Sequence, residues 1–96
     1  MKIVISSKAR QELLQIHSYI AERNLAAAEA LMQDVDRKFE NLSRFPFIGR
    51  ERSNLFPELR SMVVGSYLIF YVVERERIVI YRVLDGRRDI DSEFQR

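Results

Sequence analysis

A dense group of charged residues follows the last apolar stretch of the sequence. The group comprises Arg82, Asp85, Arg87, Arg88 and Asp89, with Gly86 among them. Because glycine permits a tight turn, Arg82, Arg87 and Arg88 could converge with Arg60 from a neighbouring strand. Guanidinium groups donate paired hydrogen bonds that suit phosphate or carboxylate oxygens. The group could therefore grip a phosphodiester or an acidic protein, or its aspartates could neutralise the arginines within a structural turn.

Other kinds of reactive site find little support in the residue types present. The chain has no cysteine and a single histidine, His17, which lies one position beyond the apolar stripe of a helical segment. No carboxylate cluster accompanies it at metal-ligand spacing, and no Ser-His-Asp set can be assembled around it. A glycine-rich phosphate loop is absent too. We expect no metal site and no cofactor, and we interpret His17 as a boundary residue of the core.

Size and composition indicate one ordinary folded domain over residues 1–96. Hydrophobic residues make up 47% and charged residues 31% of the chain, and the net charge is only +2. Every basic residue after Lys38 is an arginine. The first seven residues are too short for a signal-peptide core, and no later segment approaches the length of a membrane span. A cytoplasmic protein is therefore expected.

The first half of the sequence predicts one short strand and two helices. Lys2 to Ile5 is rich in β-branched residues, and Ser6-Ser7 offers a helix cap. A helical apolar period then runs to about Arg23, with Asn24 as its stop. A second helix follows almost at once and ends before Pro46. Because the connection is short, the two helices should form an antiparallel hairpin. Their apolar stripes consist of Ala9, Leu13, Ile16 and Ile20, and of Ala28, Leu31, Val35, Phe39 and Leu42.

The second half of the sequence is β in character. Leu59 to Val64, Tyr67 to Val73 and Ile78 to Leu84 are rich in β-branched and aromatic residues, and turn residues separate them. They predict an antiparallel meander. The order β-α-α-β-β-β predicts an α+β fold with two layers, in which the helical hairpin packs on one face of an antiparallel-dominated sheet.

The other face of the predicted sheet presents a problem of coverage. Strict alternation in the last strand would place Ile78, Ile80, Arg82 and Leu84 on one side and Val79, Tyr81 and Val83 on the other. Neither side then has the polar character of a solvated surface. Two helices can cover only one face, so an apolar, arginine-bearing face should stay open. Such a face marks a partner site, or the interface of a homodimer.

At this level of detail the sequence resembles the RelE/ParE superfamily of toxins from type II toxin–antitoxin (plasmid stabilisation) systems. The resemblance covers nearly the whole chain. No single motif identifies the family, but the complete set of motifs in this order does. The matching segments are the opening helix from Ala9 to Ile20, the junction 42–50 with its leucine, proline and glycine-arginine, Leu59-Arg60, 67–71, 80–84 and 86–89. The long hairpin and the Pro-x-x-Gly-Arg junction are more similar to the ParE branch.

The resemblance implies a toxin that is held inactive by a cognate antitoxin lying across its surface. We expect the antitoxin to contact Ile69, Tyr71 and Ile80. The ParE branch poisons DNA gyrase without hydrolysis, whereas the RelE branch cuts messenger RNA on the ribosome. We favour gyrase as the target, bound through the four arginines Arg60, Arg82, Arg87 and Arg88. A third possibility is a binding or regulatory module that has kept the fold and lost the toxicity.

Asp85 departs from the family pattern and bears on the choice of target. Relatives frequently carry histidine at this position, before the glycine-arginine-aspartate turn. Cleavage of RNA needs an acid and a base whose pKa values lie near the working pH. The neighbouring arginines should lower the pKa of Asp85 instead. If the chain is a ribonuclease, the candidate catalytic residues are Arg60, Tyr81, Arg82 and Asp85, and Tyr67 and Tyr71 are further candidates for proton transfer.

Overall fold

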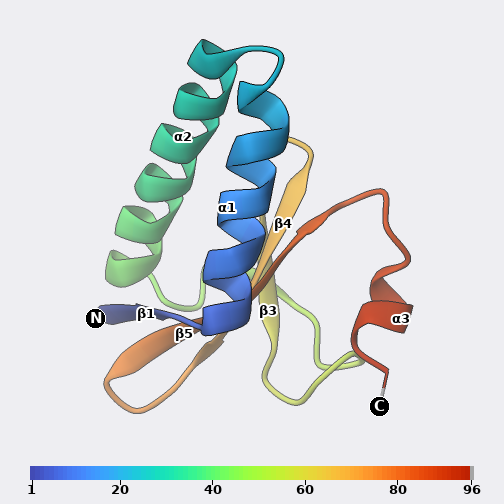
Figure 1. Cartoon of the computed structure of the whole chain (residues 1–96). Coiled ribbons are helices and arrows are strands. Elements are labelled where there is room, and N and C mark those ends of the chain that lie inside the picture. The colour runs from blue at the N-terminus through green and yellow to red at the C-terminus, as the bar shows by residue number, and fades with distance from the viewer. Residues whose placement is uncertain (96) are drawn as a thin grey trace.

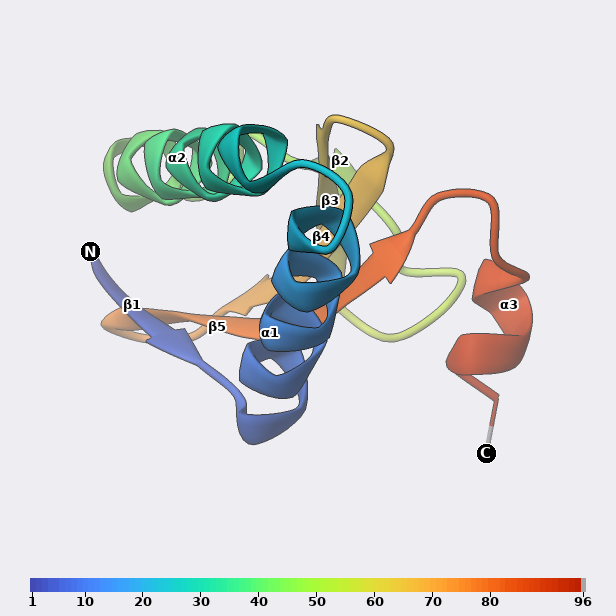
Figure 2. The same cartoon turned by 45° about the horizontal axis from the view of Figure 1, so that its top comes forward.

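The computed structural model describes residues 1–95, and it confirms the α+β class and the helical hairpin (Figures 1 and 2). Two elements were not predicted, the two-residue strand β2 and the C-terminal turn of helix α3. In chain order the elements are β1 (Lys2–Ile5), α1 (Ser7–Ala21), α2 (Leu25–Arg44), β2 (Arg50–Glu51), β3 (Arg60–Val64), β4 (Tyr67–Val73), β5 (Arg77–Asp85) and α3 (Ile90–Glu93).

Side-chain caps fix where the two long helices begin. Ser6 Oγ accepts the Ala9 amide at 3.0 Å and starts α1. Asn24, which we expected to stop the first helix, donates its amide to the Ile20 carbonyl at the end of α1 and also begins α2, because its Oδ1 accepts the Ala27 amide at 3.0 Å. The predicted apolar stripes of both helices pack towards the sheet, with Ala9, Ala28 and Leu42 fully buried. Within residues 1–95, no helix combines the length and the apolar character needed to cross a bilayer.

The five strands form one sheet in the order β1-β5-β4-β3-β2. The β2–β3, β3–β4 and β4–β5 pairs are antiparallel, while β1 returns to lie parallel to β5. Helices α1 and α2 lie together on one face, and α3 lies away from them beyond the end of β5 (Figures 1 and 2). The sheet is therefore antiparallel-dominated, as predicted.

A β-bulge in β5 overturns the strict alternation that we expected along that strand. Ile80 pairs with Tyr71 and Arg82 pairs with Phe70, so Tyr81 is an extra residue without a partner in the β4 register. Beyond the bulge the faces exchange. Val83 joins Ile78 and Ile80 in the core under the helices, and Leu84 joins the opposite face.

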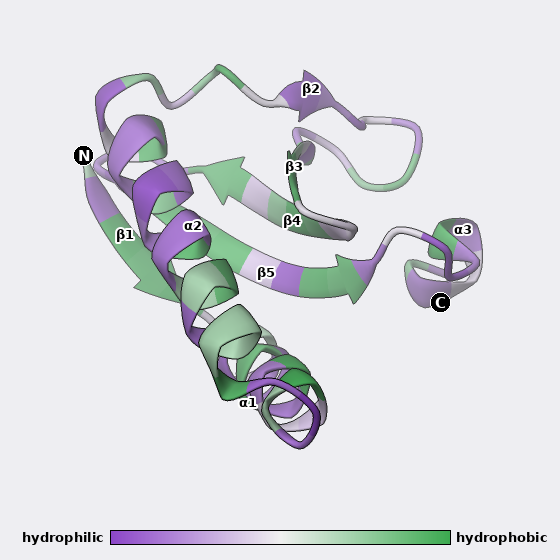
Figure 3. Ribbon diagram, turned by 90° about the horizontal axis from the view of Figure 1, so that it is seen from above, coloured by the Kyte–Doolittle hydropathy of each residue, from purple (hydrophilic) through white to green (hydrophobic). Residues whose placement is uncertain are grey.

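The second face of the sheet is covered, which corrects the prediction of an open apolar face. Its buried residues are Leu59, Phe70, Val72 and Leu84. The cover comes from the loop before β3, through Leu55, and from the C-terminal segment, through Ile90 and Phe94. The Phe94 ring meets the Phe70 ring edge-on with 4.9 Å between their centroids. Figure 3 shows that α3 carries both hydrophobic and hydrophilic residues.

Candidate functional site

The predicted charged group lines a hollow where α1 crosses the end of β5. The hollow has a volume of about 430 Å³. Three of the four arginines predicted to converge, Arg82, Arg87 and Arg88, line it together with Asp85. Its remaining lining comes from α1 (Lys8, Glu12, Gln15, Ile16 and Tyr19), from β4 and β5 (Tyr67 and Val83) and from α3 (Glu93).

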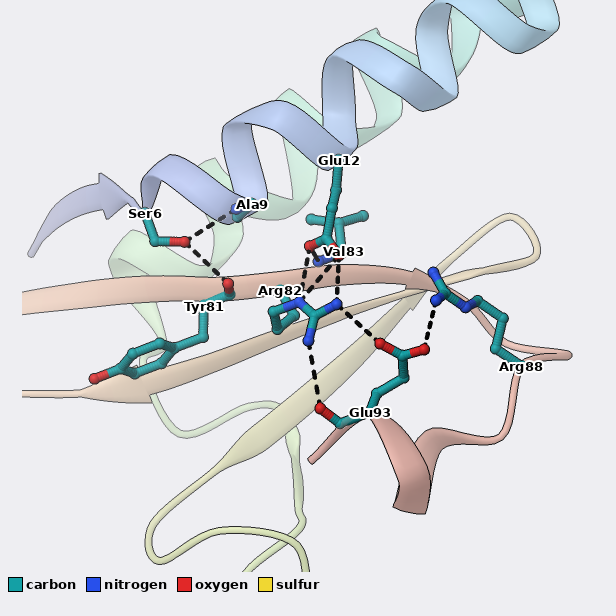
Figure 4. A network of polar contacts seen from close by, with 8 residues as sticks. All are labelled: Ser6, Ala9, Glu12, Tyr81, Arg82, Val83, Arg88 and Glu93. Carbon is teal, nitrogen blue, oxygen red and sulfur yellow. Dashed lines mark hydrogen bonds and ion pairs between the residues drawn. The ribbon is translucent and has the colours of Figure 1, made fainter. Parts of the chain in front are cut away.

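A nearly buried ion pair between Glu12 and Arg82 forms the floor of this hollow (Figure 4). The Arg82 Nη2 atom lies 2.7 Å from Glu12 Oε2, and Nε donates to the same carboxylate at 3.0 Å. The two side chains are 17% and 8% exposed. Hydrogen bonding to Glu12 raises the pKa of Arg82, so the guanidinium stays charged.

Glu12 also provides a hydrogen-bond acceptor for the backbone beside the bulge in β5. Strand β1 ends at Ile5, so the edge of β5 beyond Ile80 has no neighbouring strand among residues 1–95. Glu12 Oε1 accepts the Val83 amide at 2.9 Å, and Ser6 Oγ donates to the Tyr81 carbonyl at 2.9 Å (Figure 4). Buried backbone groups left without partners are costly, so these two side chains stabilise the bulge.

Glu93 connects the floor of the hollow to its exposed rim. Its Oε1 accepts from Arg82 Nη2 at 3.0 Å, and its Oε2 accepts from Arg88 Nη2 (Figure 4). Asp89 begins the short helix α3, because its Oδ1 accepts the Ser92 amide. The position of the C-terminal turn is thus coupled through Arg82 to Glu12 on α1.

Asp85 and Arg87 form a second ion pair at the mouth of the hollow. Asp85 Oδ2 lies 2.8 Å from Arg87 Nη2, and Oδ1 accepts the Arg87 backbone amide at 2.9 Å. Hydrogen bonding to Arg87 lowers the pKa of Asp85 to about 2, in the direction expected from the sequence. Burial, and next the Asp85 charge, raise the pKa of Tyr67. Neither group is suited to exchange protons near neutral pH.

Arg60 does not join the other three arginines. Its Nη1 donates to the carbonyl oxygens of Phe47 at 3.1 Å and Gly49 at 2.9 Å, and its guanidinium lies over the Phe47 ring at 5.2 Å from the centroid. It therefore holds the junction between α2 and β2 instead of lining the hollow. The prediction of convergence failed because it took no account of this junction, whose carbonyl groups need a donor.

Tyr81 lines a different hollow, which it shares with Arg82 but with neither Asp85 nor Arg60. The bulge places its side chain with the second face, where its ring lies 6.0 Å from that of Phe56. It is absent from the lining of the 430 Å³ hollow, and so is Arg60. The four candidate ribonuclease residues therefore do not assemble into one site in this structure.

The three residues that we expected to contact an antitoxin are core residues. Ile69, Tyr71 and Ile80 are fully buried between the sheet and the helical hairpin. Burial raises the pKa of Tyr71, and its Oη accepts the Gly49 amide at 2.8 Å. These side chains are closed to a partner on the folded chain, and the prediction for them is wrong. Alternation along the strands showed that they share a face, but it did not show which face the hairpin covers.

Sequence reasoning missed Glu12 as a site residue. It lies three residues after Ala9 and four before Ile16, and it is buried. A carboxylate within an apolar stripe needs a cationic partner, so its position was a usable signal. His17, in contrast, is the boundary residue that we expected, partly exposed and 2.9 Å from Glu29 of α2.

Known proteins resemble this chain over almost its full length. The family described as ParE toxin of type II toxin-antitoxin system, parDE, matches residues 3–90. Toxin ParE3 of Caulobacter vibrioides is 30% identical over 94 residues, which span 97% of this chain and 94% of that protein. A solved chain of the chromosomal ParDE TA system from P. aeruginosa has a TM-score of 0.75 at 19% identity, over 88% of this chain and 95% of its own, and so shares the fold. This chain belongs to the ParE toxin family of type II toxin–antitoxin systems.

Proposed function

We propose that this toxin inhibits DNA gyrase by binding, without cutting a nucleic acid, and that a cognate antitoxin neutralises it. The observation that carries the proposal is the dispersal of the candidate acid–base residues. Tyr81 and Arg60 lie outside the hollow, and the pKa of Asp85 is about 2. A group with that pKa is fully ionised at neutral pH, and it is therefore a poor general acid or base there. Membership of the ParE branch points to the same target.

Arg87 and Arg88 are the residues best placed to contact the target. Their side chains are 84% and 51% exposed at the mouth of the hollow, and each is held by one carboxylate, of Asp85 or Glu93. Arg82 is mostly buried behind them, and its ion pair with Glu93 holds the carboxylate that in turn pairs with Arg88. We therefore assign target contact to Arg87 and Arg88, and a positioning role to Arg82.

Purified toxin tests the choice of target directly. Gyrase should fail to supercoil plasmid DNA, or should accumulate cleaved DNA, in the presence of the free chain. Translating ribosomes and their messenger RNA should stay intact under the same conditions. Cuts in ribosome-bound messenger RNA that disappear in Tyr81→Phe or Arg82→Ala would instead make the chain a ribonuclease.

A variant series locates the inhibitory surface. Arg87→Ala and Arg88→Ala should each weaken gyrase inhibition about tenfold, corresponding to about 1.4 kcal/mol of lost binding. Arg75→Ala is the matched control, because Arg75 is exposed in the turn between β4 and β5 and contacts no carboxylate within residues 1–95. Equal losses in all three variants would argue against a localised surface. Arg82→Ala is less informative, since it breaks the ion pair with Glu12 and so affects folding.

Neutralisation is tested with the product of the neighbouring gene. A small antitoxin gene should accompany this one, and the two proteins should co-purify as a tight complex in which gyrase inhibition is suppressed. Growth of the host should stop when the toxin is expressed alone. Harmless high-level expression of a folded chain would contradict the toxin assignment.

A further inference from the structure

The three carboxylates that line the 430 Å³ hollow already accept hydrogen bonds through every oxygen. Both oxygens of Glu12 accept from Arg82, and both oxygens of Asp85 accept from Arg87. The two oxygens of Glu93 accept from two different arginines. The acidic side chains of the hollow are therefore occupied within the fold, and they offer little to a ligand that donates hydrogen bonds.

Several donors around the same hollow have no acceptor within residues 1–95. The Lys8 ammonium contacts no carboxylate there, because the three carboxylates pair with arginines. The hydroxyl groups of Tyr19 and Tyr67 donate to no oxygen, and burial raises the pKa of Tyr67 above its ordinary value of 10.0, so its hydroxyl keeps the proton. Arg87 and Arg88 each bind their carboxylate through Nη2 and keep Nη1 unused. Unused donors beside occupied acceptors suit an anionic ligand.

The stability of the fold does not explain the position of Lys8. It is the second residue of α1, and its side chain is exposed. The N-terminus of a helix carries a partial positive charge, so a cation in the first turn is unfavourable. The first turn of α1 contains no acidic residue that would offset it. A bound anion would instead stabilise both the lysine and the end of the helix.

The hollow is elongated along α1. At 1.5 Å per residue, Lys8 and Tyr19 lie about 16 Å apart along the helix axis, and both line the hollow. Arg23, whose guanidinium lies 5.2 Å from the centre of the Tyr19 ring, extends the row of cations. A single carboxylate side chain would occupy only part of this length. Successive phosphates of a DNA strand are about 3.4 Å apart along the duplex axis, so a DNA backbone can meet donors along all of it.

The charge of the hollow predicts weak binding to DNA alone. Four cations and three carboxylates line it, which gives a net charge of +1. Affinity for DNA rises with the number of phosphates that a protein neutralises, so so small an excess binds free DNA poorly. The contact becomes effective when another interaction already holds the toxin beside DNA, because the local concentration of phosphate is then high.

We propose that the hollow between α1 and the end of β5 binds the phosphodiester backbone of the DNA that gyrase holds. Lys8, Arg87 and Arg88 contact phosphate oxygens, and the hydroxyl groups of Tyr19 and Tyr67 donate to them. An acidic surface of gyrase itself suits the hollow less well, because its carboxylates would have to follow the same length of α1. The proposal rests on the proposed inhibition of gyrase and names the part of the gyrase complex that the arginines contact.

One matched pair of variants tests the site on the enzyme. The affinity of the toxin is measured for gyrase alone and for gyrase bound to a DNA duplex, and the DNA should raise it at least about tenfold. Lys8→Gln should reduce this gain at least about threefold and leave the affinity for DNA-free gyrase unchanged. The control is Lys2→Gln, an exposed lysine outside the hollow, which should keep the full gain. An equal loss with and without DNA in Lys8→Gln would assign the hollow to an acidic protein surface and overturn the proposal.

Titration of the free toxin with a duplex oligonucleotide provides a readout without gyrase. At low salt the amide resonances of Lys8, Tyr19 and Tyr67 should shift, and that of Lys2 should not. The slope of log affinity against log salt concentration should fall in magnitude by about one in Lys8→Gln. Inorganic phosphate at the same phosphate concentration should bind at least about tenfold more weakly. Equal binding of inorganic phosphate would make the hollow a site for small anions and overturn the assignment to a DNA backbone.

The two measurements keep failure of the DNA site separate from failure of the proposed function. A chain that binds the oligonucleotide through the hollow, yet never inhibits gyrase, would refute the target and leave the DNA site standing. Inhibition of gyrase without any gain from DNA, and without resonance shifts at the hollow, would overturn the DNA site and leave the target standing. Thermal unfolding of Lys8→Gln should show no loss of stability, so reduced binding would report the site and not the fold.

Discussion

Glu12 shows how one side chain can connect several parts of a small protein. Its carboxylate accepts from Arg82 and from the Val83 amide, so it joins α1 to the bulge of β5 and, through Glu93, to α3. The bonds of Glu12 to Arg82 and to Val83 span 70 and 71 positions of the sequence. Removing Glu12 leaves the buried Val83 N–H without its acceptor and leaves the nearly buried Arg82 cation with Glu93 as its one remaining carboxylate partner within residues 1–95.

Glu12→Ala should therefore lower the free energy of unfolding by about 3 kcal/mol. Glu12→Gln should cost less, because its amide oxygen can still accept the Val83 N–H. Urea denaturation of both variants measures the effect. Glu29→Ala is the control, since Glu29 is 60% exposed and its pair with His17 should contribute only about 0.5 kcal/mol. Similar losses in the Glu12 and Glu29 variants would contradict a special role for Glu12.

The Asp85 carboxylate should titrate at unusually low pH. Hydrogen bonding to Arg87 lowers its pKa to about 2 from an ordinary value of 3.8. Since the folded-state value is depressed, the contact stabilises the turn at all pH values above about 4, and this contribution is lost as pH falls through about 2. Carboxyl carbon chemical shifts recorded against pH measure it directly. Arg87→Ala should return the midpoint towards 3.8, and a midpoint already near 3.8 in the unmodified protein would show that the pair does not form.

At the scale of elements, the junction between α2 and β2 depends on close approach at Gly49. A side-chain carbon at this position would lie 2.7 Å from the Tyr71 ring and 2.9 Å from the Ser61 carbonyl oxygen, and both neighbours are buried. Real side-chain carbons do not approach other atoms so closely, and neither neighbour can move easily within a packed core. Glycine is required here because space is lacking.

Gly49→Ala should thus destabilise the fold by about 1 to 3 kcal/mol. Thermal unfolding of this variant beside Gly86→Ala provides the comparison, because an added carbon at Gly86 meets its nearest neighbour at 3.1 Å and the next at 3.9 Å. The Gly86 variant should show the smaller change. A neutral Gly49→Ala would mean that the junction can shift away from Tyr71.

At the scale of the whole molecule, two unequal covers enclose the sheet. The helical hairpin covers one face with long apolar stripes, while a loop and the four-residue helix α3 cover the other. The C-terminal cover depends on few contacts, chiefly Phe94 against Phe70 and Glu93 against Arg82. A segment with so few anchors should open more readily than the hairpin.

Phe94→Ala should loosen this cover selectively. We expect a loss of about 2 kcal/mol, less than for a fully buried phenylalanine, because Phe94 is only partly buried. Hydrogen exchange should accelerate at residues 90–95 and on the Phe70 side of the sheet, and it should stay slow in α1 and α2. A uniform acceleration across the chain would indicate instead that both covers unfold as one unit.

The sequence by itself determined the elements whose signals are local. Helical periodicity predicted both long helices and their buried stripes, and runs of β-branched residues predicted Tyr67–Val73 with its observed bounds. The depressed pKa of Asp85 followed from adjacent arginines in the same turn. These features were predictable because the interacting residues lie within a few positions of one another, where spacing alone constrains geometry. The ordered motifs also indicated the family.

Only the tertiary structure decided which of these residues meet. The bulge at Tyr81 exchanges the faces of β5, and a single inserted residue has no periodic signal of its own. Arg60 turns to the carbonyl groups of the α2–β2 junction, Ile69 turns towards the hairpin, and Arg82 turns to Glu12. The direction of each of these side chains depends on a partner that is distant along the chain. The sequence pattern allows several directions, and the one observed is the one that gives a buried polar group its hydrogen-bond partner or fills the core.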